Sequence, residues 1–266
     1  MRIGIAGAAG KMGSRIAALC REYDGLELAG AFERAGHKDI GRDIGIIAGI
    51  GETGVLLQEG IGKVIDSVDL VIDFTSVAST RENLTAASRH GKAMVIGTTG
   101  FSGEQIRELE PYFGKIPCVM ASNMSLGVNL LLKVLRDVAS VLGNDYDIEI
   151  IEAHHRLKKD APSGTALKMA QVIADAVNRD LDEVAVFARR GIIGERTRKE
   201  IGIQTVRAGD IVGEHTVLFG GPGERIEITH KASSRDNFAR GALKAALWLK
   251  GKPAGLYDMQ DVLNLK

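Results

Sequence analysis

The sequence is poor in cysteine, in net charge and in long apolar segments. Only two cysteines, Cys20 and Cys118, occur among 266 residues, which argues against a disulfide framework and favours a reducing cytoplasm. The 34 basic and 34 acidic side chains cancel, and this balance argues against nucleic acid as the main partner. No signal-peptide pattern opens the chain and no apolar run is long enough to span a bilayer, so we expect a cytoplasmic protein without a membrane partner.

A metal site is not expected either. The adjacent His154 and His155 cannot easily chelate one ion, and no third ligand stands at a suitable spacing. The chain has no internal repeat and no low-complexity stretch, and its length suffices for one large or two ordinary domains with a sizeable core. Composition therefore agrees with a soluble enzyme.

A dinucleotide-binding pattern opens the chain. It consists of a short apolar strand, a glycine turn, a helix and a second strand that ends on an acid, at Arg2–Ala6, Gly7–Gly13, Ser14 to about Glu22, Leu26–Phe32 and Glu33. The glycines let a pyrophosphate approach the helix N-terminus, and the acid can hydrogen-bond a ribose diol. The spacing is G-x-x-G-x-x-G rather than the stricter G-x-G-x-x-G, so the order of the elements carries the prediction. A glycine turn that binds nothing is the alternative.

Strands and helices continue to alternate through the first half. Strands are expected at Val68–Phe74, Ala93–Ile96 and Pro117–Ala121, with helices at Ala78–Arg89 and from Ser102 to about Leu109. This alternation predicts a parallel sheet, whose ligands bind at the carboxyl ends of the strands. One edge should therefore carry Gly7 to Met12, Glu33, Thr75, Gly97 to Thr99 and Ser122 to Met124. For Thr98, Thr99 and Asn123, ordinary turn chemistry is an equal alternative.

The second half has a different pattern and predicts an α+β domain. A long amphipathic helix at Gly127–Leu142 and a half-exposed strand at Asp147–Ala153 precede three runs that suggest antiparallel strands, Ile201–Ala208, Glu214–Phe219 and Arg225–Ala232. A final helix at Asn237–Lys250 is expected to return to the first domain. The expected domains are thus 1–125, 126–236 and a C-terminal segment 237–266. The basic stretch Arg189–Lys199 is either a mobile loop over the site or a solvated connection.

The most informative segment is EAHHRLKKDAPSGTAL, from Glu152 to Leu167. Ser163 is a good N-cap after Pro162, so a helix start is predicted there, with free N–H groups and partial positive charge. Gly164 allows close approach of an anion, Thr165 adds a hydroxyl, and Lys158 and Lys159 add cations, which together suit a carboxylate or a phosphate. His154 and His155 can move protons near neutral pH. Taken one at a time, these residues have an ordinary structural explanation, as a histidine that fills space or a lysine in a solvated loop.

These motifs resemble the 4-hydroxy-tetrahydrodipicolinate reductase (dihydrodipicolinate reductase) family over nearly the whole length. The matching segments are GAAGKMG at Gly7, GTTGF at Gly97, SNMSLGVN at Ser122, EAHHRLKKDAPSGTA at Glu152, RAGDIVGEHTV at Arg207 and THKASSRDNFARGA at Thr229. The histidine-to-threonine block is the most specific of them. The resemblance implies a Rossmann-type parallel sheet domain and a central α+β domain with a mixed or antiparallel sheet, which binds the substrate and forms a homotetramer.

The resemblance also implies the site. His154 is the implied acid/base group and Lys158 the implied proton donor. His155, Ser163, Gly164 and Thr165 would hold a small dicarboxylate substrate. NADH or NADPH would be held by Gly7, Ala8, Ala9, Gly10, Lys11, Met12, Glu33, Arg34, Gly97, Thr98, Thr99, Ala121, Ser122, Asn123 and Met124. The chain departs from some members at Leu157, where another histidine can occur, and at Ser76, where an arginine that helps to bind the 2′-phosphate can occur.

The implied reaction is the reduction of 4-hydroxy-tetrahydrodipicolinate by NAD(P)H with loss of water, in diaminopimelate and lysine biosynthesis. Lys158 can supply a cation and a proton where negative charge develops. Two rivals stay open. Another nicotinamide enzyme of the same architecture, such as an amino-acid or semialdehyde dehydrogenase, would not require the whole histidine-to-threonine block. A non-enzymatic redox sensor would leave His154 and Lys158 without a role.

Overall fold

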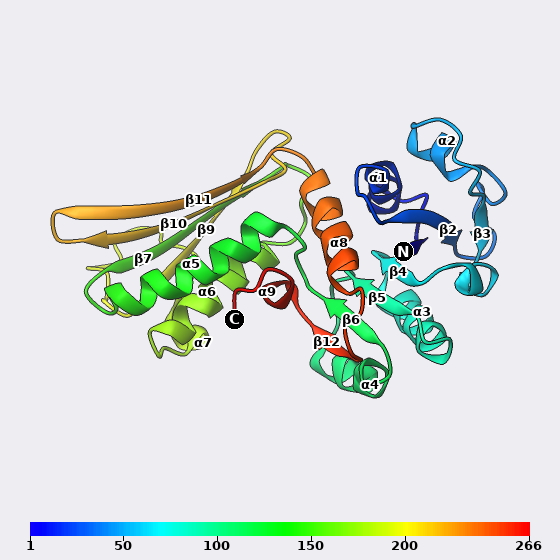
Figure 1. Ribbon diagram of the computed structural model, residues 1–266. Helices are drawn as coiled ribbons and strands as arrows, with labels where there is room; N and C mark the ends of the chain where they lie inside the picture. Colours follow the sequence, from blue (N-terminus) through cyan, green and yellow to red (C-terminus); the bar gives the residue numbers. More distant parts are fainter. The chain divides into compact units, whose positions relative to one another are not determined.

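The structure, a computed structural model, describes residues 1–266 and divides into two compact units. Unit 1 comprises Met1–Leu126 together with Asp236–Lys266, and unit 2 comprises Gly127–Arg235. Each unit has its own sheet and its own buried core, so each is described separately (Figure 1).

Unit 1 is built on a parallel sheet of seven strands in the order β12-β6-β5-β4-β1-β2-β3. The strands are β1 (Arg2–Ala6), β2 (Glu27–Glu33), β3 (Leu57–Glu59), β4 (Leu70–Asp73), β5 (Ala93–Ile96), β6 (Pro117–Met120) and β12 (Gly255–Tyr257). The predicted parallel sheet is confirmed. The strand β12 comes from the C-terminal segment and pairs with β6, so this sheet is completed by residues far apart in the sequence.

Helices cover both faces of this sheet, as its strands require, because they are apolar on both sides. The helices are α1 (Lys11–Cys20), α2 (Ile44–Ala48), α3 (Val77–Arg89), α4 (Gly103–Phe113), α8 (Asp236–Trp248) and α9 (Met259–Val262), with short 3-10 turns at Ile61–Lys63 and Ile65–Ser67. The cluster that contains Ile72 packs against α1 and α8, whereas the cluster that contains Val71 packs against α3 and α4. Neighbouring residues of one strand thus serve opposite layers.

Unit 2 is built on a mixed sheet of five strands in the order β11-β10-β7-β9-β8. The strands are β7 (Asp147–His154), β8 (Ala185–Val186), β9 (Ile201–Arg207), β10 (Gly213–Gly221) and β11 (Glu224–Ala232). The expectation of three antiparallel strands is wrong for β9, which runs parallel to both β7 and β8. Strand β7 lies between β9 and β10, so the turn that joins these two strands does not make a hairpin.

The helices of unit 2 are α5 (Leu126–Leu142, which begins on the last residue of unit 1), α6 (Gly164–Ala176) and α7 (Leu181–Val184). They pack on one face of the sheet, where Ile148 and Ile150 of β7 meet Ile203 of β9 and Val217 of β10. The inward positions of β7 are even-numbered, so Glu152 and His154 continue the same face toward the end of the strand.

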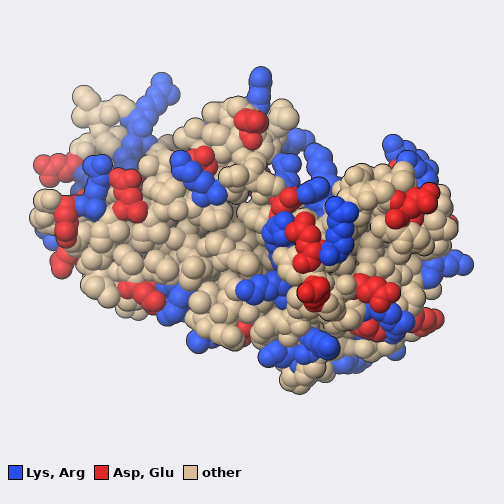
Figure 2. Space-filling model, turned by 45° about the horizontal axis from the view of Figure 1, so that its top comes forward, with Lys and Arg blue, Asp and Glu red and all other residues tan.

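Charged side chains are distributed without dominance of one sign. Basic and acidic groups lie intermixed over the face drawn in Figure 2, in agreement with the zero formal charge. None of the helices has the length and the apolar character that crossing a membrane would need.

Candidate active site

The glycine turn after β1 is shaped by close contacts with side-chain and backbone atoms. Gly7 has φ +63°, and a Cβ there would lie 2.8 Å from Cγ2 of Thr75. A Cβ on Gly13 would lie 2.3 Å from the carbonyl oxygen of Gly7, so only glycine lets α1 start this close to the turn. Gly10 caps α1 without a side-chain hydrogen bond. The helix start therefore keeps backbone N–H groups for an anion, as the sequence pattern predicts.

A pocket of about 530 Å³ lies beside this turn. It brings together four of the predicted cofactor residues, namely Gly7, Gly10, Glu33 and Arg34, and adds residues from the start of α3 and from the 3-10 turn after β3. The full lining is Gly7, Gly10, Phe32, Glu33, Arg34, Gly60, Ile61, Gly62, Phe74, Thr75, Ser76, Ser79, Glu82 and Asn83. Its acid at the end of β2 and its glycine turn fit the ribose and pyrophosphate of a dinucleotide.

A buried carboxylate, Asp73, ties the loops at this edge together. It ends β4 and accepts hydrogen bonds from the Thr75 N–H (3.0 Å), the Thr75 hydroxyl (2.6 Å) and the Asn83 amide (2.8 Å). The Thr98 hydroxyl donates to the same carboxylate at 3.2 Å, while it accepts from the Thr75 N–H at 3.0 Å. The Thr98 hydroxyl therefore forms hydrogen bonds within the protein. These bonds hold the loop after β5, and the hydroxyl does not point into the pocket.

The other predicted cofactor residues differ in exposure. Ala8 and Met124 are buried, like Thr98; Ala9, Met12, Gly97, Ala121 and Asn123 are half-buried; Lys11, Thr99 and Ser122 are exposed. A Cβ on Gly97 would lie 2.1 Å from the Phe74 ring, so this glycine is required by packing. All of these residues belong to unit 1, at or beside the carboxyl ends of β1, β2, β5 and β6.

In unit 2 the strand register gathers polar side chains at one end of the sheet. Glu152 of β7 pairs with Thr205 of β9 and with His215 of β10, and His215 pairs in turn with His230 of β11. Paired residues project from the same face, so these four positions form a polar row across four strands. The next position on that face of β7 is His154, which pairs with Arg207 of β9.

Glu152 is the centre of this row and is fully buried. Its Oε2 accepts from His154 Nδ1 at 2.6 Å and from Arg207 at 2.8 Å. Its Oε1 accepts from the Ser163 N–H at 3.0 Å, the Thr205 hydroxyl at 3.2 Å and Arg207 at 2.9 Å. Burial alone would raise the pKa of Glu152, but the hydrogen bonds from Arg207, His154 and Ser163 outweigh burial and lower the pKa to about 2.

Two of the three histidines on this face, His154 and His215, are held neutral by burial. Burial lowers the pKa of His154 below its ordinary value, although the hydrogen bond to Glu152 opposes this effect. Burial also lowers the pKa of His215 to about 4, and the neighbouring His154 adds to the shift. The two rings meet edge to face with centroids 5.3 Å apart. His215 Nε2 lies 3.0 Å from the Ser163 hydroxyl, whereas its Nδ1 is buried without a partner.

Lys158 lies in the loop between β7 and α6. Its ammonium donates to both oxygens of the exposed Asp160, at 2.9 and 2.8 Å, and this contact lowers the pKa of Asp160. Arg207 holds the same loop, since its guanidinium donates to the Asp160 carbonyl at 2.6 Å. The peptide bond between Ala161 and Pro162 is cis. Lys158 also lies close enough to His154 and His215 for its charge to lower the pKa of both rings.

The start of α6 forms as predicted. The Ser163 hydroxyl accepts from the Ala166 N–H at 3.1 Å and caps the helix. Gly164 is exposed, and a Cβ there would meet no atom within 4 Å, so a ligand can reach the backbone. Thr165 is half-buried in the same turn, and His155 Nδ1 is buried without a partner. The structure therefore places all six predicted catalytic and substrate residues within one strand end, one loop and one helix start.

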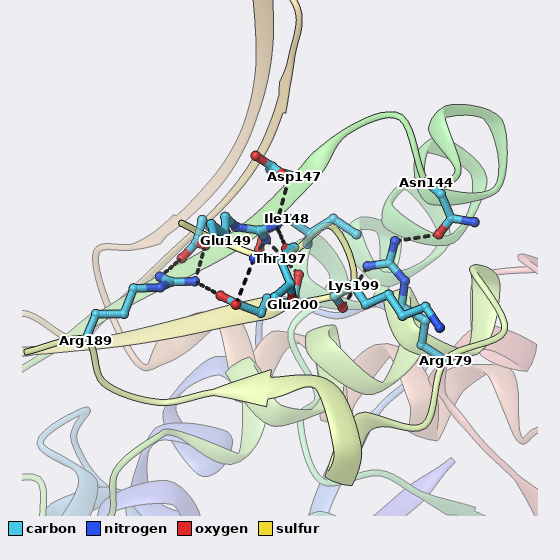
Figure 3. Close-up of polar contacts among 10 residues, drawn as sticks. Asn144, Asp147, Ile148, Glu149, Arg179, Arg189, Thr197, Lys199 and Glu200 are labelled. Atoms are coloured by element: carbon cyan, nitrogen blue, oxygen red, sulfur yellow. Dashed lines mark hydrogen bonds and ion pairs between the residues drawn. The ribbon is translucent and has the colours of Figure 1, made fainter. Parts of the chain in front are cut away.

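The basic stretch Arg189–Lys199 is anchored elsewhere on the sheet (Figure 3). Arg189 donates to both oxygens of Glu149, at 2.9 and 2.8 Å, and to Glu200 at 3.0 Å. Arg196 donates to Asp147 at 2.7 Å and to Glu149 at 3.1 Å. Asp147 and Glu149 lie at the start of β7, on the face opposite Glu152. The contacts that hold this stretch are therefore remote from His154. The structure therefore agrees better with a solvated connection than with a mobile loop over the site.

The sequence patterns did not identify Glu152, Thr205, Arg207 and His215 as residues of the polar site. Glu152 does carry a signal, because it continues the apolar phase of Ile148 and Ile150 in an alternating strand and stands two residues before His154. The other three come from distant strands and are brought together by the register alone. No group of three or more His, Cys, Asp or Glu side chains is arranged to hold a metal ion.

Two features together define the class of protein. One is a glycine turn on a parallel sheet that is suited to bind a dinucleotide. The other is a buried carboxylate–histidine pair with a lysine and an anion-binding helix start beside it. They are the features of a nicotinamide-dependent oxidoreductase. Comparison with known proteins gives the family. The family model described as "Dihydrodipicolinate reductase, N-terminus" matches residues 1–124, and that described as "Dihydrodipicolinate reductase, C-terminus" matches residues 127–263. The chain belongs to the dihydrodipicolinate reductase family, and the resemblance drawn from the sequence is confirmed.

Individual relatives agree over the full length. The chain is 61% identical to the 4-hydroxy-tetrahydrodipicolinate reductase of Syntrophobacter fumaroxidans over 266 residues, which are 100% of both chains. It is 53% identical to that of Syntrophus aciditrophicus over 262 residues, which are 98% of both chains. Among solved structures, the dipicolinate-bound dihydrodipicolinate reductase from Paenisporosarcina sp. TG-14 superimposes with a TM-score of 0.74 at 27% identity and covers 98% of both chains.

Proposed function

We propose that this chain reduces 4-hydroxy-tetrahydrodipicolinate to tetrahydrodipicolinate with loss of water, in diaminopimelate and lysine biosynthesis. The observation that carries the proposal is the polar site of unit 2, where Glu152, His154 and Lys158 adjoin the capped start of α6. This site lies in the segment that is most specific to the family, and the family match extends over both units.

The start of α6 is suited to bind the substrate. The substrate is a six-membered ring imine with two carboxylates, and a helix N-terminus with an exposed glycine stabilises such an anion through backbone N–H groups. Gly164 gives the close approach, Thr165 adds a hydroxyl donor and His155 adds a ring nitrogen. Dipicolinate, which is bound in the related structure, is likewise a ring with two flanking carboxylates.

The proton chemistry falls to Lys158 and His154. The substrate takes up one hydride and one proton, and its C4 hydroxyl is lost as water. Lys158 carries the ammonium that supplies a proton and offsets developing negative charge. In the structure this ammonium is engaged by the exposed Asp160, a contact that substrate carboxylates can replace. His154 is neutral near pH 7 because burial lowers its pKa, so it can accept a proton and return it.

Unit 1 is suited to bind the nicotinamide dinucleotide, which supplies the hydride when bound. The Gly7 turn and the free start of α1 suit the pyrophosphate, and Glu33 suits a ribose diol, as in NADH. Arg34 in the same pocket suits a 2′-phosphate, as in NADPH. Ser76, which carries no charge, lines this pocket too. We expect both cofactors to work, with NADH at least as good as NADPH.

We also propose that the enzyme is a cytoplasmic homotetramer. Its two cysteines are free and buried, which suits a reducing compartment. The face of the unit 2 sheet opposite its helices carries the partly exposed apolar side chains Ile151 and Val206, which suit contact with further copies. Sedimentation equilibrium should give four times the chain mass of 28.4 kDa.

An absorbance assay of nicotinamide oxidation tests this function directly. Freshly generated 4-hydroxy-tetrahydrodipicolinate should support turnover with NADH and with NADPH, whereas amino-acid and semialdehyde substrates should not. A KM ratio that favours NADPH by more than about a hundredfold, equivalent to roughly 2.7 kcal/mol, would overturn the expected cofactor choice. Absence of turnover with either cofactor, in protein that binds NADH, would leave the redox-sensor alternative.

A further inference from the structure

Glu152 is surrounded by hydrogen-bond donors alone. Its two oxygens receive five hydrogen bonds, from His154, Ser163 and Thr205 and twice from Arg207. No carbonyl or carboxylate faces it in these contacts. An ionised carboxylate can only accept, and burial at 0% exposure excludes exchange of these partners for water. The site is therefore built to hold a negative charge at this point.

This arrangement fixes the tautomer of His154. The 2.6 Å contact between His154 Nδ1 and Glu152 Oε2 is a hydrogen bond only when Nδ1 carries the proton. In the neutral ring, Nε2 then carries the free lone pair. A Cβ on Gly213 would lie 3.1 Å from this nitrogen, so the glycine of β10 leaves Nε2 accessible.

We propose that Glu152 is a positioning residue for the reduction, which holds His154 with its proton on Nδ1 and so keeps Nε2 as the nitrogen that exchanges a proton with the substrate. This inference rests on the proposed function of His154. Glu152 itself touches neither substrate nor cofactor. It acts through His154, and at the same time it joins β7 to β9 and to the start of α6.

The charges around His154 have opposite effects, and this makes the proposal testable. Apart from burial, which lowers the pKa of His154 most, Glu152 on β7 raises it, whereas Lys158 in the following loop and Arg207 on β9 lower it. The remaining titratable neighbour is His215 on β10, which stays neutral because burial lowers its pKa to about 4. The N-terminal turn of α6 contributes only the uncharged Ser163.

The first test compares Glu152→Gln with Arg207→Gln in the pH dependence of kcat/KM. Both variants lose buried hydrogen bonds, so both should be less stable. One limb of the pH profile is set by the titration of His154. Glu152→Gln should shift this limb to lower pH by about one unit or more, and Arg207→Gln should shift it to higher pH. Glu152→Gln should also lower kcat at least about tenfold, because an amide in place of the acid of a carboxylate–histidine pair lets the wrong tautomer form.

If Glu152 had a purely structural role, the result would differ. Both variants would lose kcat, and the His154 limb would stay in place or move in the same direction in both. That result would overturn the proposal. If Glu152→Gln does not fold, Glu152→Asp replaces it. The aspartate keeps the charge on a shorter side chain, so the limb should stay nearer its wild-type position while kcat falls. An Asp variant with an unmoved limb and full kcat would count against the proposal.

The second test does not depend on turnover. The whole protein is labelled with 15N-histidine, and His154→Gln identifies the signals of His154 among the six histidines. Long-range 1H–15N correlation near pH 7 should show His154 protonated on Nδ1. Protonation on Nε2 would overturn the inference, even in an active enzyme. Conversely, an Nδ1-protonated ring in a protein without turnover would leave this inference standing and overturn the proposed function.

Discussion

At the scale of single residues, the site combines groups that must stay charged with groups that must stay neutral. Glu152 keeps its charge in a fully buried position because five donated hydrogen bonds compensate for lost hydration. His154 and His215 stay neutral because burial lowers the pKa of each ring. The protonated Nδ1 of His154 thus lies 2.6 Å from a fixed anion, and the charge of Lys158 acts on the same ring.

Thr165 should contribute one hydrogen bond to the bound dicarboxylate. Thr165→Val removes the hydroxyl at nearly constant volume, so the substrate KM and the inhibition constant of pyridine-2,6-dicarboxylate should both rise about tenfold, the cost of one hydrogen bond to a charged group. Steady-state inhibition kinetics measures both constants, with Lys168→Ala, an exposed site on the same helix, as the control. Equal inhibition of Thr165→Val and wild type would remove Thr165 from the substrate site.

Gly213 should matter because it leaves His154 Nε2 accessible. Gly213→Ala would place a methyl group 3.1 Å from this nitrogen, so kcat/KM should fall several-fold while NADH binding is unchanged. The limb of the pH profile set by His154 should shift only slightly and to lower pH, because the methyl group adds burial to the ring and alters no charge. Full activity in this variant would show that the substrate reaches His154 from another side.

At the scale of elements, the register of the unit 2 sheet creates the polar site. Strand β7 takes Thr205 and Arg207 from one neighbour and His215 from the other. Helix α6 closes the same end through the N–H of Ser163. Because each of these contacts is buried, protonation of the histidines or of Glu152 should loosen the end of the sheet.

The pH dependence of stability should show this effect in two windows. The folded pKa of His215 is lowered from 6.5 to about 4, so the unfolded chain binds a proton more readily than the folded chain. Stability should therefore fall as pH falls from 6.5 toward 4, by on the order of 3 kcal/mol from His215. The folded pKa of Glu152 is lowered from 4.5 to about 2, so its contribution is lost at more acid pH, as pH falls from 4.5 toward 2.

Thermal melts of wild type and His215→Gln across this range measure the first window. The glutamine keeps a polar side chain next to Ser163 but does not titrate, so its melting temperature should fall less between pH 6.5 and 4. Parallel curves for the two proteins would contradict the assignment of this window to His215.

The sequence predicted those elements whose patterns are local. The strands at Arg2–Ala6 and Ala93–Ile96 match the prediction to the residue, and Ser163 caps α6 as expected, because apolar runs and capping residues act within a few positions. The dinucleotide turn was recognisable for the same reason. Gly10 and Gly13 are required by backbone contacts with Gly7, which lies next to them in the sequence, whereas Gly7 itself also meets the side chain of the distant Thr75.

What the sequence could not show depends on pairing across the chain. The parallel direction of β9 and the insertion of β7 between β9 and β10 follow from long-range packing, which a turn pattern does not encode. Short elements such as β12 and α7 have too few residues for a periodicity. Arg207 and His215 join Glu152 from 55 and 63 positions away in the numbering, so only the register identifies them as site residues.

At the scale of the whole molecule, the proposed function assigns cofactor binding and proton transfer to different units. The residues proposed to bind the dinucleotide lie in unit 1, and those proposed for acid–base chemistry and anion binding lie in unit 2. Each unit has a separate buried core. Changes in the chemistry of unit 2 should therefore leave dinucleotide affinity nearly intact, and this separation distinguishes a catalytic defect from a general loss of structure.

The most direct test of the account is kcat for Lys158→Ala. The variant should fold, as judged by circular dichroism, and should bind NADH with an affinity close to that of wild type by calorimetry. Its kcat should fall roughly a hundredfold to ten-thousandfold, the usual range for lost general acid catalysis, while Lys168→Ala should match wild type. A folded Lys158→Ala that keeps more than about a third of wild-type kcat, a difference of only about 0.6 kcal/mol, would remove Lys158 from the chemical step and contradict the central claim.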